Sequence, residues 1–297
     1  MRQRVFEILI DDKVVIKETT GVQFRVQFDV TIDAMGHVSY LDLLISNLKQ
    51  ETINKFTRDS KIGFRAGYAD AIDYIFVGRV RNVFPERDIA TRNTRIIARG
   101  GNKDKVAINR SLGKNVSLSK ILTTIAEAMG YPIDFQIEKF DVKYTSGYAM
   151  TGDAEAYLNE LSNTHNFKWV LNNDRHIICP EQDGRTSHIQ TIDMFNGHEG
   201  YPEITEVGLD FNVRLNPYLQ IGSLVNVESK NKTFNYSNLY FQDIPENAGT
   251  GTYKIFKINH KGDNFSNDWT TKCTGYFPVS YTHLTLPTII LPCRNRR

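Results

Sequence analysis

The sequence predicts a mainly β protein that carries a small mixed α/β insert. Three observations lead to this prediction. Apolar and polar residues alternate through much of residues 1–108, as they do in half-buried strands. Helical apolar stripes occur only in residues 109–183. Alternation returns in residues 203–278, so two β-rich domains are expected on either side of the insert.

The first β-rich domain, residues 1–108, opens without an apolar leader. The even positions from Phe24 to Val30 are apolar, so one face of that strand is expected to pack on a core. Ala34–His37 is expected to form a turn, and a Gly-Gly pair closes the domain. The strands expected from alternation are Arg4–Ile10, Gln23–Ile32, Val38–Ser46 and Ile96–Gly101.

The insert, residues 109–183, contains two predicted amphipathic helices. Ser117 is expected to cap the first helix, and Gly130 and Pro132 to end it. Asp153 is expected to cap the second, which ends near Asn166. The apolar faces are Leu118, Ile121, Leu122, Ile125 and Met129 in the first helix, and Ala154, Tyr157, Leu158 and Leu161 in the second.

A hairpin, a linker and the second β-rich domain are expected to follow. Phe167–Leu171 and His176–Cys179 are predicted to pair around an Asn172-Asn173 turn, because Asn tolerates positive φ. Residues 184–202 are polar and contain three glycines, which is typical of a linker. Residues 203–278 form the second domain. Within it, Asn231–Gly251 is expected to be a long loop.

The aromatic side chains of that loop leave two interpretations open. Phe234, Tyr236, Tyr240 and Phe241 could pack on a neighbouring subunit, where aromatic residues are enriched. They could also stack on sugars or bases. We favour the subunit contact.

The last residues, 279–297, are expected to be unrelated to the fold. Val279–Thr288 reads VSYTHLTLPT, which matches a translated sequencing adapter, and the rest has no strand or helix period. This segment holds three arginines and no acid. Without it, Lys and Arg fall from 36 to 33 against 34 Asp and Glu, so the net charge changes from +2 to −1.

Composition argues against several classes of protein. Outside the tail, Cys179 and Cys273 have no paired spacing, which suits a reduced protein without disulfides. No apolar run approaches the length of a membrane span, about 20 residues. The near-neutral charge argues against sequence-specific binding of nucleic acid. The strand-like run of arginines is expected to be a solvated or subunit-facing sheet face: Arg79, Arg81, Arg87, Arg92, Arg95 and Arg99.

Candidate chemical sites were compared with plain structural roles. Five possible metal ligands cluster in the sequence: His165, His176, Cys179, His188 and His198. Only His176 and Cys179 have a ligand-like spacing, and they would lie on opposite faces of one strand, so a surface His and a buried Cys are expected rather than a metal site. His260 with the carboxylate of Asp263 or Asp268 could act as a base for a nucleophile, Ser266. We favour a structural turn there, because Asp often bonds its own backbone in turns. Glu155 and Glu160 lack the pattern of a sugar-cleaving pair.

The order of features from Gly208 onward resembles a known family. GLDFNVRLNPYLQIGSLVNVES (208–229) is followed by GTYKIFKINHKGDNFSNDWTT (251–271). This order is similar to the C-terminal barrel of phage baseplate hub proteins, the late control protein D family. Leu41–Asn47, KIGFRAGY (61–68) and IFVGRVRNV (75–83) resemble strands of the same family, and the insert resembles its middle domain.

The resemblance implies a fold, a function and a set of partners. The fold would be two tail-tube-like β-barrel domains that flank a small mixed α/β domain. The protein would be a virion component of the tail baseplate, assembled in the bacterial host cytoplasm. As a homotrimer with pseudo-sixfold character, it would join the tail tube protein to the central spike protein around a channel for DNA or tape-measure protein.

The same resemblance marks structural positions and no catalytic, cofactor-binding or metal-binding residue. Trp269 is expected to fill the end of the second barrel, beside a turn built by Gly262, Asp263 and Asp268. The structural positions are Gly67, Tyr68, Gly78, Asn216, Pro217, Gly222, His260, Gly262, Asp263 and Trp269.

Two other functions stay open from sequence alone. One is the hub domain of a related contractile injection or secretion spike. The other is a tail-associated cell-wall hydrolase whose catalytic part would follow residue 278.

Overall fold

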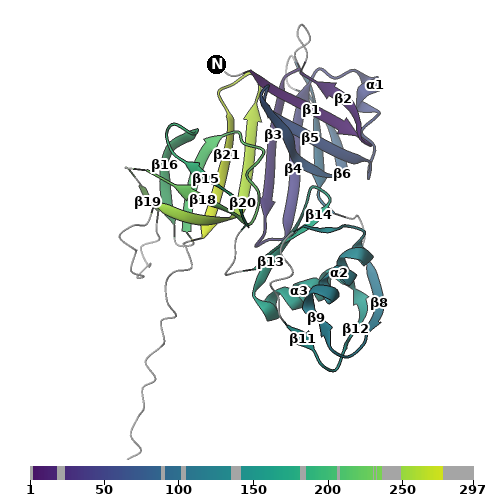
Figure 1. Cartoon of the computed structure of the whole chain (residues 1–297). Coiled ribbons are helices and arrows are strands. Elements are labelled where there is room, and N and C mark those ends of the chain that lie inside the picture. The colour runs from purple at the N-terminus through teal and green to yellow at the C-terminus, as the bar shows by residue number, and fades with distance from the viewer. Residues whose placement is uncertain are drawn as a thin grey trace, which may run out of the picture.

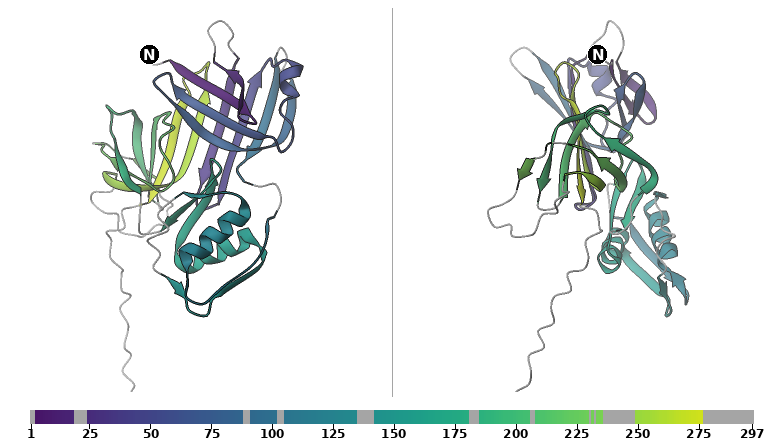
Figure 2. Two further views of the ribbon diagram at one scale, coloured as in Figure 1. Left: turned by 45° about the vertical axis from the view of Figure 1, so that its right-hand side comes forward. Right: turned by 60° about the vertical axis from the view of Figure 1, so that its left-hand side comes forward.

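The computed structural model of the chain is mainly β, with two β-rich parts and a mixed α/β part that projects from one end of them (Figures 1 and 2). The structure describes residues 3–18, 24–87, 91–101, 105–134, 142–180, 185–205, 208–229, 231, 233–235 and 249–276. Three helices lie within these ranges. No described helix is long and apolar enough to cross a membrane.

The first β-rich part contains seven described strands and one short helix, α1 (Gln50–Ile53). Val26, Phe28, Val30 and Ile32 of β3 are buried and alternate with half-buried polar residues, as the sequence predicts. The strands are β1 (Arg4–Ile10), β2 (Lys13–Lys17), β3 (Val26–Asp33), β4 (Val38–Ser46), β5 (Lys61–Tyr68), β6 (Ala71–Arg87) and β7 (Arg92–Arg99).

The mixed part is built around helices α2 (Leu118–Met129) and α3 (Ala154–His165). The Ser117 hydroxyl accepts from Lys120 N, and Asp153 accepts from Glu155 N, as expected for N-caps. Gly130 and Asn166 end the helices in the left-handed conformation. The strands are β8 (Ala107–Leu112), β9 (Val116–Ser117), β10 (Ile133–Asp134), β11 (Lys143–Tyr144), β12 (Tyr148–Asp153), β13 (Phe167–Asn172) and β14 (Arg175–Pro180).

The hairpin of β13 and β14 turns one residue later than predicted. Asn172 belongs to the strand, and Asn173 and Asp174 occupy the turn with φ of 50° and 57°. Two consecutive positive φ values suit a type I′ turn, which Asn and Asp tolerate.

The second β-rich part also starts earlier than expected, because residues 184–202 contribute strands where a linker was predicted. Apolar residues such as Ile189 do alternate with polar residues such as Gln190 there, but the mostly polar composition hides the strand pattern. The strands are β15 (Arg185–Ile192), β16 (His198–Thr205), β17 (Gly208–Arg214), β18 (Ser223–Val227), β19 (Thr233–Asn235), β20 (Gly251–Asp263) and β21 (Trp269–Tyr276).

Strand pairing differs from the two expected barrels. The described strands of both β-rich parts form one open fourteen-stranded sheet, in the order β19-β16-β17-β21-β20-β3-β4-β7-β6-β5-β1-β2, with β18 and β15 branching from β20. No described strand pair closes either half into a barrel. One edge of β3 pairs with β20 of the second β-rich part instead of with a strand of its own part. The alternation of apolar and polar residues does not indicate which strands pair.

Two hydrophobic cores stabilise the molecule. The larger core crosses the junction of the two β-rich parts and also takes in Val170 and Ile177 from the hairpin of the mixed part. The smaller core lies between α2, α3 and the strands of the mixed part. The aromatic side chains predicted in the 231–251 loop and the tail at 279–297 fall outside the described residues.

Candidate functional site

The junction between β3 and β20 is the most distinctive site of the fold. The two strands pair antiparallel from Lys257 opposite Asp33 to Asp263 opposite Gln27. They stand in the middle of eight consecutive antiparallel strands, β16-β17-β21-β20-β3-β4-β7-β6, which we call the central array. Residues far apart in sequence therefore share one continuous surface, visible as the adjacent yellow and blue-purple strands of Figure 1.

One face of the central array is polar and its charges are matched across strands. Lys257 pairs with Asp33 at 3.4 Å, and Lys272 with Asp210 at 2.7 Å. Asn259 Nδ2 donates to Asp29 at 2.6 Å. Cross-strand pairs of opposite charge stabilise a sheet and leave little net charge on its surface.

The opposite face of the junction is apolar and centres on Trp269, the first residue of β21. The indole is 1% exposed and packs edge-to-face on Phe28 at a centroid distance of 5.2 Å. Its Nε1–H donates to the Gly67 main-chain oxygen at 3.1 Å, and the Arg4 guanidinium lies 5.6 Å from the ring centroid. Trp269 thus packs on the first β-rich part and holds the two parts together, rather than filling the end of a separate barrel.

Gly262 is explained by this packing. A Cβ at that position would lie 2.5 Å from the Phe28 ring and 2.7 Å from Trp269 Cε3. Contacts that short do not occur between real Cβ atoms and ring carbons, so the aromatic pair requires glycine here.

The Asp263 carboxylate connects the turn between β20 and β21 to the first β-rich part. Its carboxylate accepts from Arg25 Nη2 at 2.8 Å, Gln27 Nε2 at 3.0 Å and Phe265 N at 2.9 Å. Burial by itself raises the pKa of Asp263, but these hydrogen bonds and the Arg25 charge outweigh it, so the pKa lies below the ordinary value of 3.8. The residue is a structural anion at neutral pH.

Two further residues hold the same turn. Asn264 Oδ1 accepts from Val26 N, and Asn264 Nδ2 donates to the Phe24 main-chain oxygen, both at 2.8 Å. Arg4 donates to the main-chain oxygens of Ser266 and Asn267. The turn is therefore tied to both β1 and β3.

His260, the candidate base, lies on the face of β20 opposite to Asp263. It is fully buried, with Nδ1 2.8 Å from Thr271 Oγ1, and burial lowers the pKa of His260 to about 3. Ser266 Oγ accepts from Asp268 N. The structure therefore does not assemble His260, Asp263 and Ser266 into a nucleophile, base and orienter.

The histidines considered as metal ligands are dispersed. His165 Nε2 contacts Tyr144 Oη at 2.7 Å, and His176 Nδ1 contacts the Tyr131 main-chain oxygen at 3.2 Å. His176 is buried, which corrects the surface position expected for it, because β14 turns that face onto the aromatic rings of Tyr131 and Trp169. Among the described residues, no group of three or more His, Cys, Asp and Glu could hold a metal ion. The side chains of Cys179 and His188 lie outside the described set.

The remaining structural positions lie in turns and close strand contacts. Asn216 Oδ1 accepts from Tyr218 N, and its amide nitrogen donates to Gln190, so the Asn216-Pro217 turn is closed locally. Gly222 has φ of +81° and donates its N–H to the main-chain oxygen of Ile255. At Gly67 and Gly78, a Cβ would lie 2.0 Å from Ala71 O and 2.5 Å from Arg99 O. Tyr68, the last residue of β5, packs against the larger core.

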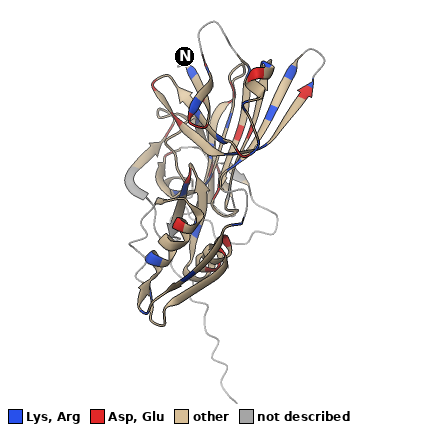
Figure 3. Cartoon of the chain, turned by 90° about the vertical axis from the view of Figure 1, so that its right-hand side faces the viewer, with Lys and Arg blue, Asp and Glu red and all other residues tan. Residues whose placement is uncertain are grey.

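Three of the six arginines of β6 and β7 bond to oxygens of neighbouring residues. Arg81 pairs with Asp59 at 3.1 Å, Arg79 donates to the Asp59 main-chain oxygen, and Arg95 bridges Asp42 and Glu86. Figure 3 shows basic and acidic residues interspersed on these strands.

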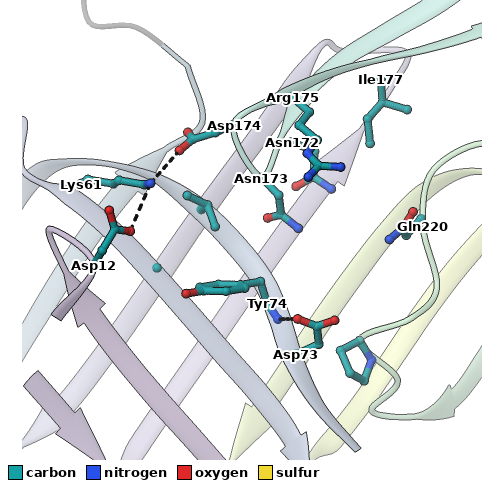
Figure 4. A pocket seen from close by; sticks show the side chains of 13 residues that line it. Asp12, Lys61, Asp73, Tyr74, Asn172, Asn173, Asp174, Arg175, Ile177 and Gln220 are labelled. Carbon is teal, nitrogen blue, oxygen red and sulfur yellow. Dashed lines mark hydrogen bonds and ion pairs between the residues drawn. The ribbon is translucent and has the colours of Figure 1, made fainter. Parts of the chain in front are cut away.

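The three parts of the chain meet around a polar pocket of about 330 Å³ (Figure 4). Lys61 of β5 bridges Asp12 at 3.2 Å and Asp174 at 3.3 Å, which ties the hairpin of the mixed part to the first β-rich part. Pro217 and Gln220 close the pocket from the second part. The Asn172 and Asn173 side-chain oxygens are buried there without a donor in the described structure.

Sequence reasoning did not find the partners of the junction. Arg4, Arg25 and Phe28 looked like ordinary strand residues.

Comparisons with known proteins agree with a tail protein. The family model described as Baseplate hub gp41 matches residues 18–241. No curated protein sequence matches. The fold is similar to a 43 kDa tail protein of prophage MuSo2 from Shewanella oneidensis, with a TM-score of 0.57 and 8% identity over 94% of this chain and 97% of that one.

Two other solved structures show the same fold. A tail protein from Neisseria meningitidis has a TM-score of 0.59 and 9% identity, over 92% of this chain and 96% of that one. An E. coli component of the type VI secretion system, described as similar to T4 tail proteins gp27 and gp5, has a TM-score of 0.50 and 8% identity, over 91% and 76%. At these identities, the likenesses establish the fold.

Proposed function

The chain belongs to the Baseplate hub gp41 family, and on that premise we propose that its central array lines the channel of a ring that joins the tail tube to the central spike. The structural role in a phage tail hub, expected from sequence, is confirmed by the family match. How the chain performs that role is the proposal.

The observation that supports a channel lining best is the continuous polar face across β20 and β3. A surface that lines a channel for DNA or tape-measure protein should not bind these molecules tightly. Binding of DNA scales with the number of phosphates that Lys and Arg neutralise. Here Lys257, Lys272 and Arg95 each face a carboxylate on a neighbouring strand, which leaves few cations for phosphates.

The presence of two β-rich parts within one chain supports a homotrimer. Three copies would present six such parts around the channel, so a threefold spike could meet a sixfold tube. The two end strands of the central array are only partly covered, because β19 pairs with part of β16 and β5 with part of β6. Proteins cover such open stretches of strand edge by pairing or assembly. Closed rings are the usual form of head-to-tail assembly.

The finer family assignment and the partners belong to the same proposal. The order of strand, Asn-Pro turn, glycine turn and Trp269 supports the late control protein D branch. One rim of the ring would bind the tail tube protein and the other the spike protein, with assembly in the bacterial host cytoplasm before incorporation in the virion.

We propose no catalytic role for the chain. The buried, neutral His260 and the ion-paired Asp263 are used for packing. Glu155 and Glu160 lie on helix α3 of the mixed part, five positions apart.

A hub of a contractile injection or secretion device is the second candidate. The fold it shares with an E. coli type VI secretion component favours this candidate. The two differ in where the assembled protein is found: in a virion or in a cell-bound device.

Localisation in virions tests the proposal. A phage that carries an epitope-tagged copy should bind gold-labelled antibody at the tail tip after mild disruption of the baseplate, and a non-sense mutant should give tails without a baseplate. Label along the tube or on the capsid would contradict a hub role. Virions without any label would favour the secretion device.

A further inference from the structure

The turn between β15 and β16 presents two large apolar side chains to solvent. Met194 is 76% exposed and Phe195 is 83% exposed. Asp193 makes this edge turn (residues 193–197) rigid, because its Oδ1 accepts from the main-chain N–H groups of Phe195 and Asn196, both at 2.8 Å. Exposed apolar groups held on a fixed backbone are typical of a contact with another molecule.

A matching groove lies at the other lateral end of the central array. The β6–β7 hairpin extends past β5, which pairs with β6 only as far as Arg79. The groove, about 570 Å³, lies between this arm and α1, and its apolar lining comes from Ile53, Val83 and Pro85. The main-chain hydrogen bond from Asn47 N to Arg92 O, 2.7 Å, extends the pairing of β4 with β7 to the outer end of the arm.

Both ends also have open strand edges within the described residues. On β16, pairing with β19 covers only Glu203–Thr205, so residues 198–202 have no partner strand on that side. On β6, residues 82–87 pair with β7 alone. Figure 1 places β16 on the left of the molecule and α1 and β6 on the right. The two ends of one chain therefore cannot meet, but those of neighbouring copies can.

Charge at the two ends is complementary. Asp193 and Glu199 lie in or beside the edge turn, next to Arg214, whose side chain lies against Gly197. Arg87 and Arg92 line the groove, and neither forms an ion pair with another described residue. Opposite charges at an interface fix the register and speed the encounter.

We propose that the edge turn of one copy docks in the arm groove of a second copy, with Phe195 against Ile53 and Val83 and with Glu199 facing Arg92. The contact is head-to-tail, so repetition closes a ring when the rotation between copies allows it. This inference rests on the ring-forming hub proposed above and names the surfaces that form it.

The experiment uses the full chain with charge and apolar variants, measured by light scattering after gel filtration over a range of concentrations. Phe195→Ser should weaken assembly at least tenfold, while the melting temperature stays unchanged, because the side chain is exposed. Glu199→Arg and Arg92→Glu should each weaken assembly, and the double variant should restore it. Glu127→Arg, an exposed change on helix α2, is the matched control and should assemble like the wild type.

Normal assembly of Phe195→Ser would overturn the proposal, and so would a double variant that assembles no better than the single ones. If Phe195→Ser forms normal oligomers but fails to enter virions, the turn binds another tail component instead. A wild type that stays monomeric also overturns the docking. Tail-tip labelling of virions then decides separately whether the hub function stands.

Discussion

The indole Nε1–H of Trp269 donates to the main-chain oxygen of Gly67 at 3.1 Å, across 202 residues of sequence. Trp269 begins β21 and Gly67 is near the end of β5. The hydrogen bond and the Phe28–Trp269 ring contact join the two β-rich parts. Changes at this junction should therefore affect both parts together.

The substitution Trp269→Ala should destabilise the protein by about 3–5 kcal/mol, as expected when a large buried aromatic side chain is removed. Chemical denaturation would measure this loss. Because the junction is shared, hydrogen exchange should increase in both β3 and β20.

Fluorescence provides the control for Trp269. In a Trp169→Phe variant, Trp269 is the remaining indole and should emit at short wavelength, shielded from quenchers. Trp169 itself lies in the mixed part, where its Nε1–H donates to Asn159. A red-shifted, readily quenched Trp269 would show that it is exposed and that the junction is formed differently.

Asp263→Asn should lower stability by about 1–3 kcal/mol at neutral pH, because charge-assisted hydrogen bonds to the carboxylate are lost. The folded-state pKa of Asp263 is lowered, so its stabilisation is complete above the ordinary value of 3.8 and is lost as the pH falls through the folded value. The variant should thus approach the wild type in acid. A difference that stays constant down to acid unfolding would contradict the ion pair.

His260 should make the protein sensitive to mild acid. Its pKa is lowered to about 3, so below the ordinary value of 6.5 the unfolded chain binds a proton that the folded chain does not. Stability is therefore complete above pH 6.5 and falls by about 1.4 kcal/mol per pH unit toward pH 3.

His260→Gln should flatten this dependence. His176, whose pKa burial lowers to about 4, should account for a second part of the slope. If His260→Gln and the wild type lose stability equally between pH 6.5 and pH 4, His260 is not buried as a neutral ring.

Lys61→Met should loosen the mixed part without unfolding the molecule. Ion pairs near the surface contribute at most about 1 kcal/mol, so the melting temperature should change little. Loss of the bridge between Asp12 and Asp174 should nevertheless increase hydrogen exchange at the β13–β14 turn. Lys257→Met, which removes an ion pair on the polar face of the central array, is the control and should leave that turn protected. Equal exchange in both variants would contradict the positioning role of Lys61.

Local features of the fold could be predicted from the sequence. The structure has β1 at Arg4–Ile10 and β4 at Val38–Ser46, with the bounds expected from alternation. Helix α2 begins after Ser117 and ends at Gly130, as the capping residues predict. These features depend on neighbouring residues, so a single sequence contains them.

Long-range pairing could not be predicted in the same way. Alternation shows that β3 and β20 each bury one face, but not that they pair with each other across the chain. The strands β15 and β16 were missed because their polar composition suited a linker. The structural roles of Arg4, Arg25 and Phe28 depend on the same long-range pairing.

A cryo-electron microscopy reconstruction of the intact baseplate tests the central claim most directly. We predict three copies around the channel at the tail tip, with Lys257, Asn259 and Lys272 of the central array facing the lumen. A ring in which this face points outward, or a tail tip without the protein, would contradict the account.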